Sequence, residues 1–324
     1  MKRKLSKQGP SLFAIGLGCA SLGGSFYGLD GSIQGYGPMK EDSALNIVKT
    51  ALEQGINFLN CADIFGGGEA EKRIGKVIAT GDYDVYIGTS FGLIFDTNTA
   101  TIKSIIDHPD YVREATIASL KRFGLSHLDL IQLQVPKLHE SLIHEIFDSC
   151  NDLVQEGLIS GFGWVTNDFN LASSVPHVKN PNFLGIQYTY NLVDRQLKMK
   201  EYLDSIEKGH IINGVLKNGI LTGKYLNSYR PDNNHVISRF NFENEEYKRY
   251  FNFLRLIKPL IEDADYSLTE FAIGWLLQTH TTAIPIIGAK SVDQIHLNLS
   301  VIDKGLPNSK LINEIESIYF ENIN

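Results

Sequence analysis

Two kinds of hydrophobic pattern alternate along the chain and predict its secondary structure. Short apolar runs are typical of buried strands, and apolar positions three and four residues apart are typical of amphipathic helices. The predicted strands are residues 11–18, 57–60, 84–90, 128–134, 158–165, 183–188, 210–216 and 282–288. Helical patterns alternate with these runs. This is the arrangement expected of a (β/α)8 or TIM barrel, predicted here as a single domain over residues 1–324.

Three helices have the clearest patterns. Residues 44–52 carry one apolar face, and Gly55 follows as a residue suited to the end of a helix. Residues 142–154 carry a longer apolar stripe that stops before Gly157. Ser267 and Glu270 form a capping box ahead of an apolar run. The longest irregular region, 226–247, precedes a helix predicted at 247–261 and would be either a lid beside the pocket or a plain surface loop.

Composition narrows the class of protein. A hydrophobic content of 43% in 324 residues allows a large core, and a net charge of −7 argues against nucleic-acid binding. The basic start of the chain lacks a following apolar run, so no signal peptide is predicted, and no stretch is long enough to span a membrane. The three cysteines are too far apart for a disulfide framework or a zinc site. We therefore expect a cytoplasmic protein without a metal.

The stretch "INFLNCADIFGGGEAE", residues 56–71, raises the question of chemistry. It reads as a strand end, a Gly-rich turn and the charged start of a helix at Glu69. Strand ends that open onto loops are where barrel enzymes place their catalytic groups. Here, however, Asn60, Cys61 and Phe65 supply no acid, base or cation.

From end to end the chain resembles the aldo/keto reductase family. The resemblance rests on the order of several segments, each weak alone: "GLGCASLGG", "ALEQGINFLNCADIFGGGEAEKRIGKVI", "YIGTSFG", "SLKRFGLSHLDLIQLQ", "LVQEGLISGFGW", "IQYTYNLVDR", "GILTGKY" and "IPIIGAKSVDQIHLNL". It implies the barrel fold and a hydride transfer from NADPH to a carbonyl. In that family a tyrosine supplies the proton, a lysine paired with an aspartate lowers the pKa of the tyrosine, and a histidine orients the carbonyl.

All four of these catalytic positions are changed in this chain. The aspartate position falls on Asn60, the tyrosine on Phe65, the lysine on Ser90 and the histidine on Gln134. Phe65 has no hydroxyl to give a proton, and a general acid contributes a factor on the order of 10²–10⁴ in rate. The remaining replacements avoid an unpaired buried charge, and Gln132 should face the same inner side of its strand. The sequence thus predicts a polar, uncharged, amide-rich pocket without the usual reductase mechanism.

The cofactor side of the resemblance is mixed. "LTGKY", with Leu221, Gly223 and Lys224, matches the loop that approaches the pyrophosphate, and Lys290 and Ser291 stand at a helix start suited to a phosphate. Gln187 matches the glutamine that binds the carboxamide, and Asn298 an asparagine beside the adenine. Gln294 stands where many members carry arginine, and Asn213 replaces the aromatic ring that stacks on the nicotinamide. The serine–asparagine pair of the family falls on 165–166 or 166–167. NADP(H) binding is therefore left open, and both lysines could instead be plain surface residues.

A few further residues could take over chemistry. His139 is a candidate general base, although a solvated loop histidine is the commoner case. Asp63 could reach the mouth of the barrel or serve only in the turn, and strand alternation should turn Cys61 away from the pocket. Trp164 and Tyr190 would either wall the pocket or pack between barrel and helices.

Three hypotheses of function follow from these patterns. The first is a repurposed pocket for a small polar ligand, such as a sugar or a nucleotide-linked metabolite, with non-redox catalysis or none. The second is a non-catalytic NADP(H)-binding regulatory protein or a subunit for a protein partner, as some family members are on ion channels. The third is an atypical NADP-dependent oxidoreductase in which water, His139 or Asp63 supplies the proton.

Overall fold

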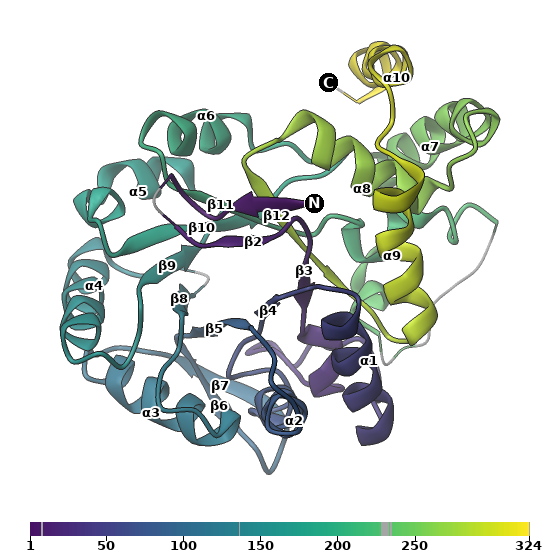
Figure 1. Ribbon diagram of the computed structural model, residues 1–324. Coiled ribbons are helices and arrows are strands. Elements are labelled where there is room, and N and C mark those ends of the chain that lie inside the picture. Colours follow the sequence, from purple (N-terminus) through teal and green to yellow (C-terminus); the bar gives the residue numbers. More distant parts are fainter. Residues whose placement is uncertain (8, 136, 228–232, 234, 324) are drawn as a thin grey trace.

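The computed structural model describes residues 1–7, 9–135, 137–227, 233 and 235–323. Its centre is a closed barrel of eight parallel strands in the order β10-β11-β12-β3-β4-β5-β8-β9, with helices around it (Figure 1). The fold is therefore the predicted (β/α)8 barrel. The barrel strands are β3 (Gly16–Gly18), β4 (Phe58–Asn60), β5 (Tyr86–Phe91), β8 (Leu130–Gln134), β9 (Phe162–Val165), β10 (Phe183–Thr189), β11 (Gly209–Asn213) and β12 (Ala283–Gly288).

The helices follow the predicted periodicity. They are α1 (Glu41–Glu53), α2 (Glu69–Ile78), α3 (Tyr111–Phe123), α4 (Glu140–Gln155), α5 (Phe169–Ser174), α6 (Leu197–Ser205), α7 (Glu245–Asp263), α8 (Leu268–Thr279), α9 (Val292–Lys304) and α10 (Ser309–Asn322). The predicted capping box of Ser267 and Glu270 begins α8. Gly55 follows α1 with φ of 89°, a left-handed conformation that glycine adopts without steric cost. Within the irregular region 226–247, residues 228–232 and 234 lie outside the described residues.

The prediction of one strand over 11–18 was wrong. The segment divides into β2 (Ser11–Phe13), which pairs antiparallel with β1 (Lys2–Lys4), and β3 of the barrel. The hairpin buries Leu5 and Leu12 with Phe58 and Leu130, which face the barrel interior. The carbonyl of Leu5 also lies against Gly209, the first residue of β11. An apolar run that caps the amino end of a barrel has the same pattern as a strand within it, so the pattern alone does not separate them.

A second hairpin has no counterpart in the sequence prediction. Strands β6 (Leu93–Asp96) and β7 (Thr101–Ile105) pair antiparallel directly after β5. Two strands are shorter than predicted. β9 begins at Phe162 rather than at residue 158, and β11 ends at Asn213 rather than at residue 216. Gly214, with φ of 63°, then turns the chain away from the barrel into the short helix η3 (Lys217–Thr222).

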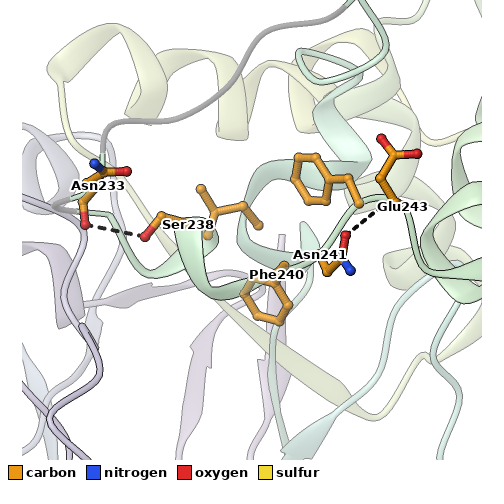
Figure 2. A pocket seen from close by; sticks show the side chains of 7 residues that line it. Asn233, Ser238, Phe240, Asn241 and Glu243 are labelled. Atoms are coloured by element: carbon orange, nitrogen blue, oxygen red, sulfur yellow. Dashed lines mark hydrogen bonds between the residues drawn. The ribbon is translucent and has the colours of Figure 1, made fainter.

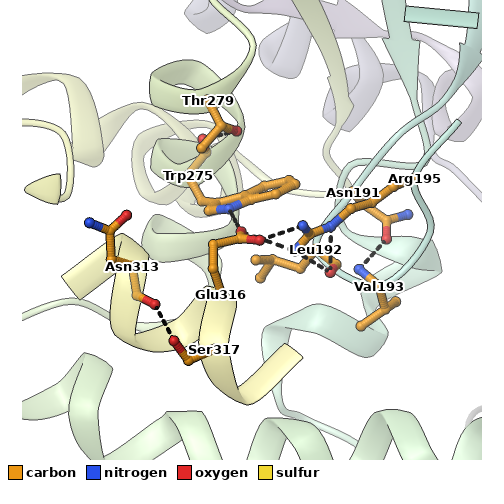
Figure 3. Close-up of polar contacts among 9 residues, drawn as sticks. All are labelled: Asn191, Leu192, Val193, Arg195, Trp275, Thr279, Asn313, Glu316 and Ser317. Atoms are coloured by element: carbon orange, nitrogen blue, oxygen red, sulfur yellow. Dashed lines mark hydrogen bonds and ion pairs between the residues drawn. The ribbon is translucent and has the colours of Figure 1, made fainter. Parts of the chain in front are cut away.

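The last helix is held by a buried ion pair (Figure 3). Arg195, in the loop after β10, binds Glu316 of α10 through two nitrogens at 2.6 and 3.1 Å. The indole Nε1 of Trp275 in α8 donates to the same carboxylate at 2.7 Å. The guanidinium also lies 3.5 Å from the ring centre of Tyr319. This cluster joins α8, α10 and the β10 loop through one charged pair.

We expect Arg195→Ala to lower the free energy of unfolding by about 2–3 kcal/mol, because it leaves the partly buried Glu316 carboxylate with Trp275 as its remaining partner. The control is Arg113→Ala in the exposed pair with Glu156, where the side chains are 47% and 44% exposed against 9% and 22% for Arg195 and Glu316. That change should cost about 1 kcal/mol or less. Urea denaturation of both variants measures the difference, and equal losses would contradict the assignment.

Two buried histidines lie outside the barrel wall. The Tyr188 hydroxyl lies 2.8 Å from Nδ1 of His210 and 2.9 Å from Nε2 of His280. Burial lowers the pKa of His210 to about 4, although the Asp204 carboxylate 3.0 Å away opposes that shift. Burial, with the charges of His210 and Lys200, lowers the pKa of His280 to about 3. Both rings are therefore neutral in the folded protein at neutral pH.

This arrangement makes stability depend on pH in a defined window. Between pH 6.5 and about 4 the unfolded chain protonates these rings and the folded chain does not, so the free energy of unfolding falls as the pH is lowered. Each ring should contribute a slope of about 1.4 kcal/mol per pH unit. We expect His280→Gln to flatten the measured profile by that amount, and the same change at exposed His296 to leave it unaltered. Equal profiles in both variants would contradict this expectation.

Candidate active site

Three amide side chains fill the barrel interior beneath the carboxyl ends of the strands. Nδ2 of Asn60 donates to Oε1 of Gln187 at 3.0 Å. Nε2 of Gln132 donates to Oδ1 of Asn60 at 2.8 Å and approaches Oε1 of Gln187 at 3.2 Å. All three residues are buried, and they come from β4, β8 and β10. The amides thus bind one another, and the predicted inward position of Gln132 is confirmed.

This network provides hydrogen-bond partners for two positions that the family resemblance singles out. Asn60, which stands where the resemblance implies a carboxylate, is satisfied by amides and requires no lysine. Gln187, which the resemblance assigns to a carboxamide, already accepts from Asn60 and Gln132. Oε1 of Gln132 is buried without a hydrogen-bond partner among the described residues. A buried, unpaired carbonyl is costly and marks a place for a water or a ligand donor.

A second polar layer lies one step higher on the strands. Ser90 is buried at the end of β5, and Gln134 is half-buried at the end of β8. On the other side of the mouth, the hydroxyl of Thr189 donates to Oδ1 of Asn213 at 2.9 Å and accepts from Nδ2 of Asn167 at 3.3 Å. Asn213 is therefore fixed by hydrogen bonds and offers no ring. The backbone N–H of Thr189 also donates to Oδ1 of Asn167, which places Asn167 on the rim.

Phe65 belongs to a small apolar cluster beside these amides. Its ring centre lies 6.2 Å from that of Phe26, which in turn lies 6.3 Å from Phe95 of β6. Gly66, Gly67 and Gly68 all have positive φ, so the turn after Phe65 uses backbone conformations that other residues rarely adopt. The carbonyl of Gly23 lies against Gly66, and only glycine fits that approach. The neighbours of Phe65 thus come from two other loops.

A buried charged cluster supports the same turn from outside the barrel. Glu71 of α2 accepts from the Thr89 hydroxyl at 2.6 Å and binds Nε of Arg122, whose side chain covers Gly68. Burial and the negative charge of Glu71 raise the pKa of Asp63 well above its usual range. Asp63 therefore lies beside Glu71 and Arg122 and interacts electrostatically with them. The Cys61 thiol is buried too, and its pKa is raised by burial.

His139 begins helix α4. Its Nδ1 accepts from the backbone N–H of Ser141 at 3.3 Å and lies 2.7 Å from the Ser141 hydroxyl. The ring is exposed and serves as an N-cap, so the structure gives it a role without chemistry. Trp164 packs on Phe147, and Tyr190 stacks on Trp275 at an interplanar angle of 13°. Both are core residues between barrel and helices.

The loop that the resemblance assigns to a pyrophosphate makes hydrogen bonds within itself. Leu221 is buried, and its N–H donates to the carbonyl of Leu216. Gly223 ends η3 with φ of 78°. Lys224 is exposed at its tip, and its pKa is lowered by burial of its stem and by the charge of Lys290. The two lysines that the sequence singled out therefore lie in one electrostatic neighbourhood.

The start of α9 is capped by its own side chains. The Ser291 hydroxyl accepts from the N–H of Gln294, and Oε1 of Gln294 accepts from the N–H of Lys290 at 2.7 Å. Asn298 is buried and donates to the carbonyl of Gly288 at 3.4 Å. Gln294 therefore stabilises the helix terminus, while Lys290 has no carboxylate within ion-pair distance among the described residues.

The small cavity in Figure 2 is separate from these residues. It has a volume of about 260 Å³ and is lined only by residues between Asn233 and Glu243, in the segment before α7. Figure 2 shows Asn233 and Ser238 joined by a hydrogen bond at one side. None of the predicted site residues lines it. The candidate active site is therefore the barrel mouth and not this cavity.

The uncharged interior has a testable electrostatic consequence. We expect Asn60→Asp and Ser90→Lys each to lower the free energy of unfolding by about 3 kcal/mol at pH 7, because each buries an unpaired charge. The double variant should lose about 1–3 kcal/mol less than the sum, because β4 and β5 are neighbours and the new charges would pair. The control is Ser90→Met, because methionine is similar in size to lysine but carries no charge. Additive losses in the double variant would show that the two positions do not communicate.

Comparison with known proteins identifies the family. The model of the aldo/keto reductase family matches residues 14–319. "Uncharacterized oxidoreductase YqkF" of Bacillus subtilis (strain 168) is 29% identical over 306 residues, which cover 92% of this chain and 90% of that protein.

Two solved structures share the fold. A glycerol dehydrogenase from Gluconobacter oxydans has a TM-score of 0.83 at 20% identity, covering 99% of this chain and 96% of its own. An aldo-keto reductase from Klebsiella pneumoniae in complex with NADPH has a TM-score of 0.70 at 14% identity, covering 98% and 95%. With its family match over nearly the whole length and its eight-stranded barrel, this chain belongs to the aldo/keto reductase family.

Proposed function

We propose that the barrel mouth binds a small, uncharged, polar ligand and does not reduce carbonyls by the usual mechanism of its family. The observation that carries this proposal is the amide network of Asn60, Gln132 and Gln187. It occupies the place of a charged relay, and Phe65 supplies no proton at the mouth. The aldo/keto reductase fold is retained, while the groups that would move the proton are absent from their positions.

The side chains around the mouth favour a ligand rich in hydroxyl groups. Amides and hydroxyls both donate and accept, and Asn60, Ser90, Gln134, Thr189 and Asn213 carry no charge. The partly exposed ring of Phe65 adds an apolar surface of the kind on which a sugar face can pack. A sugar, or the sugar part of a nucleotide-linked metabolite, has this combination of polar edges and a neutral body. Any catalysis there would be non-redox.

An atypical reductase receives less support from the contacts. His139 caps α4, and the Asp63 carboxyl interacts electrostatically with Glu71 and Arg122. Neither contact directs a proton donor to the amide layer. Water would remain as the donor, without a neighbouring base or acid among the inward-facing residues described above.

A second candidate function, non-catalytic NADP(H) binding in a regulatory protein, rests on Lys224 and Lys290. Their mutual repulsion would be relieved by an anion between them, and the start of α9 beside Lys290 adds a favourable dipole. The residues fit the phosphates of a dinucleotide. They do not fit its nicotinamide, because Gln187 is engaged and Asn213 has no ring to stack.

Cofactor titration separates these functions. Fluorescence titration with NADPH is followed by an aldehyde panel and by thermal-shift measurements with sugars and polyols. Stabilisation by a neutral polyol without NADPH binding supports the first proposal, and tight NADPH binding without turnover supports the second. In the first case Gln187→Leu should weaken polyol binding, with Gln294→Leu as the control amide outside the barrel. Turnover of NADPH with an aldehyde would contradict both.

Restoring the family residues tests the reason for inactivity. The variant with Asn60→Asp, Phe65→Tyr, Ser90→Lys and Gln134→His is made alone and together with Asn213→Tyr. We expect carbonyl reduction to rise at least about 10²-fold over the wild-type background in the variant with the added ring, since a positioned acid contributes this much. The matched control keeps Phe65 in both backgrounds and should remain inactive. Equal activity with and without Phe65→Tyr would refute the assigned role of the missing hydroxyl.

A further inference from the structure

Two histidines far apart in sequence meet on the outside of the barrel. His144 is in α4, and His177 is in the short helix η2 (Pro176–Lys179) that precedes β10. Their Nδ1 atoms are 3.1 Å apart, and the ring centres are 5.1 Å apart with planes inclined at 50°. The side chains are 33% and 17% exposed, so the pair is partly buried but reachable from solvent.

A carboxylate lies at the far nitrogen of each ring. Oδ1 of Asp148 is 2.8 Å from Nε2 of His177, and Oε1 of Glu140 is 3.7 Å from Nε2 of His144. Glu140, His144 and Asp148 follow one another at intervals of four residues and therefore share one face of α4. Histidines that bind metals usually donate their second N–H to a carboxylate, as His177 does to Asp148, which fixes the ring and raises its basicity.

We propose that His144 and His177 form a two-imidazole binding site for a borderline divalent cation such as Zn²⁺. A metal ion about 2.0–2.1 Å from each of two nitrogens holds them about 2.9–3.4 Å apart at octahedral or tetrahedral angles, which brackets the 3.1 Å seen here. Water completes the coordination, because the carboxylates occupy the outer nitrogens. Among the described residues no group of three or more such ligands is arranged for a metal, so this site is limited to two protein ligands.

The proton between the two rings can move when a cation binds. The Asp148 carboxylate can only accept, so Nε2 of His177 carries the proton of that contact. In the form of the pair with one proton on each ring, Nδ1 of His177 has a lone pair and Nδ1–H of His144 donates to it. When the cation takes both Nδ1 atoms, the proton of His144 moves to Nε2, facing Glu140. A small rotation of the rings then directs both lone pairs to the ion. Imidazole favours Zn²⁺, Ni²⁺ or Cu²⁺ over Mg²⁺ and Ca²⁺, which prefer oxygen.

The test uses the untagged full-length protein and ZnCl2, with MgCl2 as the control ion. Isothermal titration should show one Zn²⁺ bound, with a rise in Tm that MgCl2 does not produce. His144→Ala and His177→Ala should each weaken binding on the order of tenfold or more, and Asp148→Asn on the order of tenfold through the orientation of His177. His296→Ala, at an exposed histidine on α9, is the matched control and should change nothing.

A second measurement does not depend on any variant. Nitrogen-15 NMR of the wild-type histidines should show Zn²⁺ shifting Nδ1 of His144 and His177 while the other imidazoles stay unchanged. The proposal is overturned if the wild type binds no Zn²⁺ at micromolar concentrations, if the affinity survives both alanine changes, or if the metal-shifted nitrogens belong to other histidines.

Discussion

A charge inside a closed barrel is stable only when an opposite charge or several hydrogen bonds accompany it, because no bulk water reaches it. This constraint accounts for the neutral residues at the barrel mouth as a set. With a neutral Asn60, a lysine at position 90 would be buried without a partner, and Ser90 adds no charge. The amide of Asn60 then requires donors and acceptors of its own, which Gln132 and Gln187 supply. A neutral residue at position 60 thus makes neutral residues at the neighbouring positions favourable.

Outside the barrel the chain does bury charged groups, and these are stable because they form ion pairs. Glu71 with Arg122 holds the glycine turn after β4, and Arg195 with Glu316 holds α10 against the β10 loop. Both pairs join elements that are distant in sequence and that carry or border the mouth. The chain therefore uses ion pairs to position its loops and hydrogen-bonded amides to line its interior. This division agrees with the proposal of an uncharged ligand in the mouth.

No helix among the described residues has the length and apolar character needed to cross a bilayer. The exterior carries instead several local clusters of polar residues, of which the His144–His177 pair has the best-defined geometry. It lies behind β9 and β10, on the elements that precede the rim residues Asn167 and Thr189. A cation there would tie α4 to η2 and stiffen this side of the wall. Its chemistry is distinct from that of the mouth, because it depends on neutral imidazoles rather than on amides.

The sequence by itself determined the barrel and the approximate position of the helices with the clearest patterns. Strand and helix periods and caps such as Ser267 are local signals, and the order of family segments predicts site positions at Asn60, Phe65, Ser90 and Gln134. Tertiary structure alone decided the contacts. The division of 11–18 and the hairpin β6–β7 are local, but they form where the barrel gives these segments something to pack against. The pairing of Asn60 with Gln187 and the meeting of His144 with His177 join residues distant along the chain. Their partners depend on how the closed barrel brings strand ends and helix faces together, and no local pattern of hydrophobic and polar residues records that geometry.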